Sequence, residues 1–146
     1  MIGRVNLKNG KVEYLEVPAQ VIGQKGKDEE VLCGKTVPND MKNGDGFQGT
    51  MDKRIAGNGW GDVSWAPPIL VRDLIYFPTM VGMVYVLKWN VNTFDEDALV
   101  SVSDLGRTGE TSSLPRLAYA DGKIFAWTMK EMISIGEQVN RSYVEN

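Results

Sequence analysis

The sequence predicts an all-β protein of antiparallel sheets, and two observations lead to this fold class. Three short apolar segments follow one another at 66–71, 74–79 and 83–87, and they are rich in Val, Ile, Tyr and Phe. β-Branched and aromatic side chains of this kind favour a pleated, half-buried surface. The segments are separated by only about two to five residues, the usual length of hairpin loops, so we expect an antiparallel meander.

A second meander is expected at 114–135, because the same pattern recurs there. The pair Thr128-Met129 corresponds to Thr79-Met80 at an offset of 49 residues. A three-stranded meander cannot bury both of its faces alone, so the two are expected to stack. Internal repeats of about 40 to 50 residues, each holding several short strands, are typical of β-propeller blades. A chance likeness between two unrelated meanders is the alternative.

The remaining segments complete a partial β-propeller. Residues 98–105 are expected to be the outer strand of a four-stranded blade at 62–105, and residues 106–146 a second blade, with a last strand at 141–144. The chain opens on a half blade at 1–22, discussed next. The whole of 1–146 is expected to be a single partial-propeller domain.

The half blade is expected to be a hairpin. Residues 3–7 and 12–17 alternate apolar and polar side chains. Asn9-Gly10 between them predicts a two-residue turn, since both residue types tolerate positive φ. Pro18 is expected to limit strand pairing beyond this point, because proline has no amide proton to donate.

Residues 23–61 are predicted to form a long glycine-rich insertion. The short apolar island at 31–33 is a candidate strand within it. Loops longer than about 12 to 15 residues are usually functional or disordered. Regularly spaced apolar residues, among them Phe47 and Trp60, predict that much of the insertion is ordered against the blades.

Composition excludes several classes of function. The chain has 146 residues, a net charge of −3 and no histidine. This net negative charge lacks the excess of basic residues typical of nucleic-acid-binding proteins, and no apolar run is long enough for membrane insertion. The first ten residues lack the apolar core of a signal peptide. We expect neither nucleic acid nor membrane insertion.

The absence of histidine also bears on catalysis. Without histidine there is no Ser-His-Asp or Cys-His arrangement, and with one cysteine a zinc site is close to excluded. The segment 39–46 has oxygen ligands and glycines, but it lacks the register of a calcium loop. We expect no metal, no cofactor and no catalytic residues, which favours a non-enzymatic protein.

Candidate ligand-binding residues lie in the insertion. Asp52, Lys53 and Arg54 offer a carboxylate and two cations that could clamp an anion, or they form a solvated salt-bridge cluster. Trp60 is a candidate stacking platform for a sugar or a quinone, as any tryptophan here could be, but core packing between blades is expected for Trp65 and Trp127 because they lie beside predicted strands. The other tryptophans are Trp65, Trp89 and Trp127.

Three segments resemble the repeats of quinoprotein-like (pyrroloquinoline-quinone-type) β-propellers. Residues 82–87, GMVYVL, resemble the Gly-x-Val-Tyr-Ala-Leu strand, and residues 121–125, DGKIF, resemble the Asp-Gly-x-Val-Tyr strand entry. Residues 7–14, LKNGKVEY, are similar to the Leu-Asp-x-x-Thr-Gly-Lys-x-x-Trp segment. The resemblance covers 1–18 and 65–136 and implies a propeller; for the family it suggests a periplasmic or exported location.

The same resemblance does not imply the family's dehydrogenase activity. Of the tryptophan-docking motif, Gly10 and Lys11 match, whereas Arg4, Asn6 and Tyr14 do not. Quinoprotein alcohol dehydrogenases of this type also use two adjacent cysteines beside the cofactor, and this chain has one. The resemblance therefore implies the propeller fold but not the dehydrogenase activity.

Three functions remain as hypotheses. The first is a non-enzymatic interaction or scaffold domain, as a fragment of a larger propeller protein. The second is a small-ligand or carbohydrate-binding module, and the third is a fragment of a quinone-dependent dehydrogenase.

Self-association follows from the first hypothesis, because two and a half blades would expose both terminal faces. We expect a two-fold dimer in which the N-terminal hairpin of one copy docks on the last blade of another, unless the missing blades of a larger propeller fill that place. The side chains expected at the exposed faces are Val5, Leu7 and Val12 at one end and Phe125, Trp127 and Met132 at the other.

Overall fold

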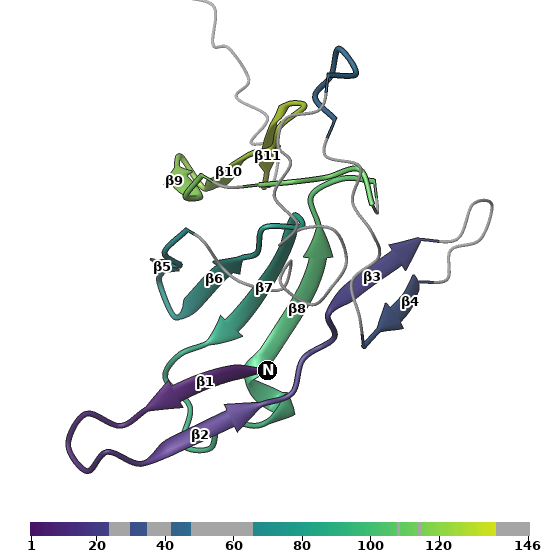
Figure 1. The fold of residues 1–146 in the computed structure, drawn as a ribbon. Coiled ribbons are helices and arrows are strands. Elements are labelled where there is room, and N and C mark those ends of the chain that lie inside the picture. The colour runs from purple at the N-terminus through teal and green to yellow at the C-terminus, as the bar shows by residue number, and fades with distance from the viewer. Residues whose placement is uncertain (24–29, 35–41, 48–65, 108, 114, 137–146) are drawn as a thin grey trace, which may run out of the picture.

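The computed structural model describes residues 1–23, 30–34, 42–47, 66–107, 109–113 and 115–136. This part of the chain is all-β and forms four antiparallel sheets, with one short 3-10 turn, η3 (Glu96–Ala98). Figure 1 shows the largest sheet in the middle, with two N-terminal hairpins along one side of it and a smaller sheet beyond it. The predicted fold class, antiparallel and all-β, is confirmed, and no sheet closes on itself.

The central sheet has four strands in the order β5-β6-β7-β8. Its strands are β5 (Ile69–Val71), β6 (Leu74–Pro78), β7 (Met83–Lys88) and β8 (Leu99–Asp104). The predicted meander is therefore confirmed, and the segment expected as its outer strand pairs with β7.

The second meander is confirmed as a three-stranded sheet in the order β11-β10-β9. Its strands, β9 (Ala118–Ala120), β10 (Lys123–Trp127) and β11 (Met132–Ile135), each begin 49 residues after β5, β6 and β7. Among the described residues, no strand pairs with the outer edge of β11 in the way that β8 pairs with β7. The strand predicted at 141–144 lies outside the described residues.

The two meanders pack face to face through alternate side chains of β7. Val84 and Val86 point to one face of the central sheet, where they are buried with Ile124 and Ala126 of the smaller sheet and with Leu117, which precedes β9. This is the stacking predicted from the inability of one meander to bury both faces. Residues 83–87 are buried on both sides, which explains why β7 reads as a continuous apolar run.

The polar segment before β9 joins the two Thr-Met turns. The carbonyl of Met80 accepts hydrogen bonds from Ser112 Oγ (3.1 Å) and Ser113 N (3.0 Å). The amide of Met129 donates to the carbonyl of Ser112 (3.0 Å). Ser112 and Ser113 are buried, so this segment connects the repeats internally and does not present a polar surface.

The opposite face of β7 is covered by the N-terminal hairpins. They consist of β1 (Ile2–Val5) with β2 (Val12–Leu15), and β3 (Gln20–Gly23) with β4 (Glu30–Cys33). Met83 and Tyr85 pack with Val21, and Leu87 packs with Leu15 and Phe94. The molecule is thus a stack of three layers: the hairpins, the central sheet and the three-stranded sheet (Figure 1).

The turn expected in the N-terminal hairpin is wrong. The connection between β1 and β2 is a four-residue loop at 7–10, because Val5 pairs with Val12 and the amide of Asn6 donates to the carbonyl of Lys11. A two-residue turn of the expected kind needs positive φ at both positions, and only Gly10 adopts it (71°). The pairing of this hairpin ends at Leu15, before Pro18, and the next strand, β3, belongs to a separate sheet with β4.

Candidate functional site

A groove of about 490 Å³ lies between the β1–β2 hairpin and the connection that follows β7. One wall comes from the hairpin and its loop, and it is formed by Arg4, Val5, Asn6, Asn9, Lys11 and Glu13. The other wall comes from four consecutive residues after β7, Trp89, Asn90, Val91 and Asn92. The two walls are more than 75 residues apart in the sequence, so the groove depends on how the hairpin docks.

Arg4 fixes this docking. It lies opposite Glu13 across the hairpin, and its Nε and Nη2 both donate to Glu13 Oε2, the first at 3.0 Å. Its Nη1 donates to the carbonyl of Val91 at 2.7 Å and Nη2 to that of Asn92 at 3.2 Å. The guanidinium also lies 5.2 Å from the ring centroid of Phe94. One side chain thereby ties both walls together.

The pKa of the Glu13 carboxylate is shifted by its contacts with Arg4 and Lys11. Hydrogen bonding from Arg4 lowers the pKa of Glu13 below its ordinary value of 4.5, and the positive charges of Arg4 and Lys11 add to the effect. Lys11 Nζ lies 3.5 Å from Glu13 Oε1. Arg4, Glu13 and Lys11 therefore form a connected charge cluster at the floor and rim of the groove.

The rest of the lining is an exposed indole and four carboxamides. Trp89 is 47% exposed. The side-chain oxygens of Asn6 and Asn9 accept hydrogen bonds from the amides of Lys8 and Lys11, both at 2.9 Å. These bonds orient the two carboxamides. The remaining carboxamides belong to Asn90 and Asn92, which are also exposed.

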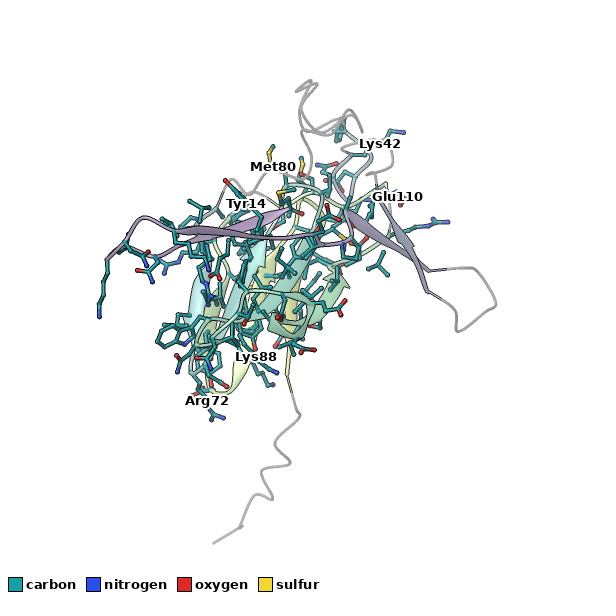
Figure 2. The ribbon with its side chains drawn as sticks, turned by 90° about the horizontal axis from the view of Figure 1, so that it is seen from below. Tyr14, Lys42, Arg72, Met80, Lys88 and Glu110 are labelled. Carbon is teal, nitrogen blue, oxygen red and sulfur yellow. The ribbon has the colours of Figure 1, made fainter. Side chains whose placement is uncertain are left out.

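Two apolar faces lie at opposite ends of the three-layer stack. The outer face of the β1–β2 hairpin carries Val5, Val12 and Tyr14, which are 53%, 46% and 65% exposed. Figure 2 shows Tyr14 on the side of the hairpin that faces away from the central sheet. A Cβ at Gly3 would stand 3.2 Å from the Tyr14 ring, so this ring covers the glycine across the strand pair.

The other apolar face belongs to the three-stranded sheet. Trp127 and Met132 are direct cross-strand partners, and they are 59% and 61% exposed. Phe125 lies on the same side of β10 and is half-buried. Five of the six side chains expected at the terminal faces are thus exposed, and Leu7 is the most exposed of them. The core packing expected for Trp127 is wrong, because the side chain is 59% exposed and points away from the central sheet.

The ligand-binding residues predicted from the sequence, Asp52, Lys53, Arg54 and Trp60, lie outside the described residues. The turn that resembled a calcium loop is described only from residue 42. Asn43 Oδ1 accepts hydrogen bonds from the amides of Asp45 and Phe47, an ordinary turn of the asparagine type. Phe47 is 71% exposed, so this residue of the insertion does not pack on the sheets as expected.

Sequence reasoning missed the groove because it placed the hairpin in the wrong register. A two-residue turn at Asn9-Gly10 would set Arg4 opposite Leu15, whereas the observed register sets it opposite Glu13. Opposite charges on directly facing residues stabilise a strand pair. The complementary charges of Arg4 and Glu13 were the signal that could have corrected the register.

Comparisons with models of known protein families, with curated proteins and with solved structures found no match. Within the described part of the chain, no three His, Cys, Asp or Glu side chains gather as a metal site would require. No helix in that part has the length and apolar character needed to cross a membrane.

Proposed function

We propose that this protein is a non-enzymatic interaction domain of the β-propeller type, which assembles by stacking one sheet on another. The observation that carries the proposal is the pair of apolar faces at opposite ends of the stack, centred on Tyr14 and on Trp127. Exposed apolar patches of this kind commonly mark interaction sites. The lack of histidine and the single cysteine argue against a catalytic role.

The propeller interpretation is supported by the internal repeat. Two meanders with strands 49 residues apart pack face to face, as neighbouring blades do in a propeller. A blade within a propeller has a neighbour on each face. Within the described residues, each terminal layer has one neighbour, so a further sheet is what both exposed faces would take.

The occupant that we propose is a second copy of this chain. The hairpin face of one copy is apolar and aromatic, with Val5, Val12 and Tyr14, and the face that it would cover carries Trp127 and Met132. None of these five side chains is charged, but Lys123 lies on the same side of β10 as Trp127, so the contact must leave its ammonium group in water. Because the two faces point in opposite directions, this contact is head-to-tail: a dimer joins one hairpin face to one Trp127 face, and further copies can add to the faces left free.

Sedimentation equilibrium at micromolar concentration tests this proposal, and a dimer is the expected result. Tyr14→Lys and Trp127→Lys should each shift the equilibrium toward monomer, because a lysine in the contact would be desolvated without a partner. Leu70→Lys is the matched control, since Leu70 is 59% exposed but lies on β5, away from both faces. It should leave the dimer unchanged.

Mixing the two variants makes the test sharper. A Tyr14→Lys copy keeps an intact Trp127 face, and a Trp127→Lys copy keeps an intact hairpin face, so the mixture can form one intact contact and should partly recover the dimer. A wild-type protein that stays monomeric, or a dimer that survives both substitutions, would overturn the proposal. Failure of the mixture to recover association, although each variant alone is monomeric, would also overturn the proposed contact between the two unlike faces.

A further inference from the structure

We propose that the groove beside Trp89 binds a neutral carbohydrate chain. This site adjoins the hairpin face of the proposed assembly, with which it shares Val5, and it includes no residue of the Trp127 face. The juxtaposition that carries the inference is a half-exposed indole facing a wall of fixed carboxamides, with the nearby charges already paired. Each part of this arrangement matches one property of a sugar ring.

The indole supplies the stacking surface. Trp89 follows the last residue of β7, and its amide donates to the carbonyl of Asp73 at 3.4 Å, so its backbone belongs to the rigid central sheet. An aromatic ring has a negative face that attracts the positively polarised C–H groups of a pyranose ring. Trp89 thus offers an anchored platform for one face of a sugar.

The carboxamides supply the polar recognition. A sugar hydroxyl both donates and accepts hydrogen bonds, and a carboxamide offers both functions in one group. The side-chain oxygens of Asn6 and Asn9 are held by Lys8 and Lys11, while their amino groups donate to no other described residue. Asn90 and Asn92 on the facing wall likewise make no side-chain hydrogen bond within the described part of the chain. Hydroxyls of a bound sugar would satisfy these groups from both sides.

The charges of the groove determine that the ligand is neutral. Arg4 uses four of its five N–H donors on Glu13 and on the carbonyls of Val91 and Asn92, so a bidentate clamp on an anion would break bonds that hold the groove together. Lys11 lies against the same carboxylate. The cluster carries two positive charges and one negative charge, too small an excess to bind a polyanion, and the chain as a whole has a net charge of −3.

The same features argue against other ligands. Sites for drug-like apolar molecules are lined mainly by hydrophobic side chains, and this lining is mainly polar. Single-stranded nucleic acid also stacks on aromatic rings, but it requires a positively charged groove along its backbone. The volume of about 490 Å³ is within the range of small-molecule sites. The walls are held together by Arg4 before a ligand arrives, which lowers the cost of ordering them.

Isothermal titration calorimetry with neutral hexasaccharides tests the proposal on the full chain. Maltohexaose, cellohexaose, mannohexaose and chitohexaose are the probes, and saturable binding of at least one of them is expected. Trp89→Ala should weaken that binding by about tenfold or more, as truncation of a tryptophan anchor does in other interfaces. Asn92→Ala should weaken it several-fold without unfolding the protein, because its side chain is exposed.

Trp127→Ala is the matched control. This variant removes a tryptophan that is even more exposed than Trp89 but does not line the groove, and it should bind as the wild type does. Absence of binding by all four hexasaccharides would overturn the proposal. So would binding that survives Trp89→Ala, or a preference for dextran sulfate or a single-stranded oligonucleotide, which would assign the groove to a polyanion.

Discussion

Arg72 and Asp121 occupy the same place in the two meanders and share an unusual backbone conformation. Each stands in the turn between the first two strands, 49 residues apart, with φ of 56° and 48°. Among the described residues, no other non-glycine residue has positive φ. The internal repeat therefore extends from the order of strands to the backbone conformation of one turn.

Replacing Arg72 by glycine is expected to leave the free energy of unfolding unchanged or to raise it by up to about 1 kcal/mol. The left-handed conformation costs a non-glycine residue about 1–2 kcal/mol, and glycine adds about 0.5–1 kcal/mol of unfolded-state entropy against this gain. Asp73→Gly is the control, because Asp73 does not have positive φ and only the entropy loss should remain. Urea denaturation measures the free energy of unfolding of both variants. If Arg72→Gly lost as much stability as the control, the backbone at Arg72 would not be strained.

Gly82→Ala is expected to destabilise the protein by at least about 2 kcal/mol. Gly82 has φ of 85°, and a Cβ there would stand 2.5 Å from Thr111 Cγ2. Gly10→Ala measures the cost of the positive φ alone, without a clash, since Gly10 has φ of 71° and nothing lies within 4 Å of the added carbon. It should cost about 1 kcal/mol.

The clash at Gly82 can be relieved separately. Thr111→Ser removes the methyl group and keeps the hydroxyl that donates to the carbonyl of Arg107. In the Gly82→Ala background it should recover part of the lost stability, as measured by thermal unfolding. Equal losses in Gly82→Ala and Gly10→Ala would show that the turn moves to accept the extra carbon.

The sequence predicted the sheets well where strands are adjacent along the chain. β5 to β7 and β9 to β11 are encoded by apolar runs and short turns, so local pattern was sufficient to place them. The repeat of the Thr-Met pair also pointed to the equivalent turns that Ser112 and Ser113 connect.

The groove could not be predicted, because it depends on contacts between distant segments. Its walls meet only because Arg4 reaches the carbonyls of Val91 and Asn92. Every residue has a backbone carbonyl, so the sequence does not show which carbonyls Arg4 will bind. The strand β3 was missed for a related reason: Pro18 seemed to end the region, but its carbonyl serves as an acceptor for Tyr85. Tertiary contacts decided both features.

Tyr85→Phe is expected to lower the free energy of unfolding by about 1–2 kcal/mol. The Tyr85 hydroxyl donates to the carbonyl of Pro18 at 2.6 Å, and the side chain is 3% exposed, so its removal leaves a part-buried carbonyl without this donor. Tyr76→Phe is the matched control, since Tyr76 of β6 makes no hydroxyl hydrogen bond within the described chain. Urea denaturation should show little change in the control; similar losses in both variants would contradict the role of the bond.

The Arg4–Glu13 pair should make stability depend on pH below about 5. The pKa of Glu13 is lowered from 4.5 in the folded protein, chiefly by the hydrogen bond from Arg4. The folded state therefore holds fewer protons on this group than the unfolded state does. The stability supplied by the pair is fully present above 4.5 and is lost as the pH falls through the lowered pKa.

NMR titration of the Glu13 carboxyl carbon, with urea denaturation over the same pH range, measures this effect. Arg4→Met should return the pKa of Glu13 toward its ordinary value, because the main hydrogen-bond donor is removed. Glu13→Gln should make the fall in stability on acidification shallower, since Gln does not titrate. Glu16→Gln is the control: Glu16 is exposed just beyond β2 and forms no ion pair within the described chain, so its removal should keep the wild-type slope. If Arg4→Met left the Glu13 titration unchanged, the guanidinium would not be the group that holds this carboxylate, and the docking of the hairpin would have to rest on the apolar contacts of Leu15 and Ile2 alone.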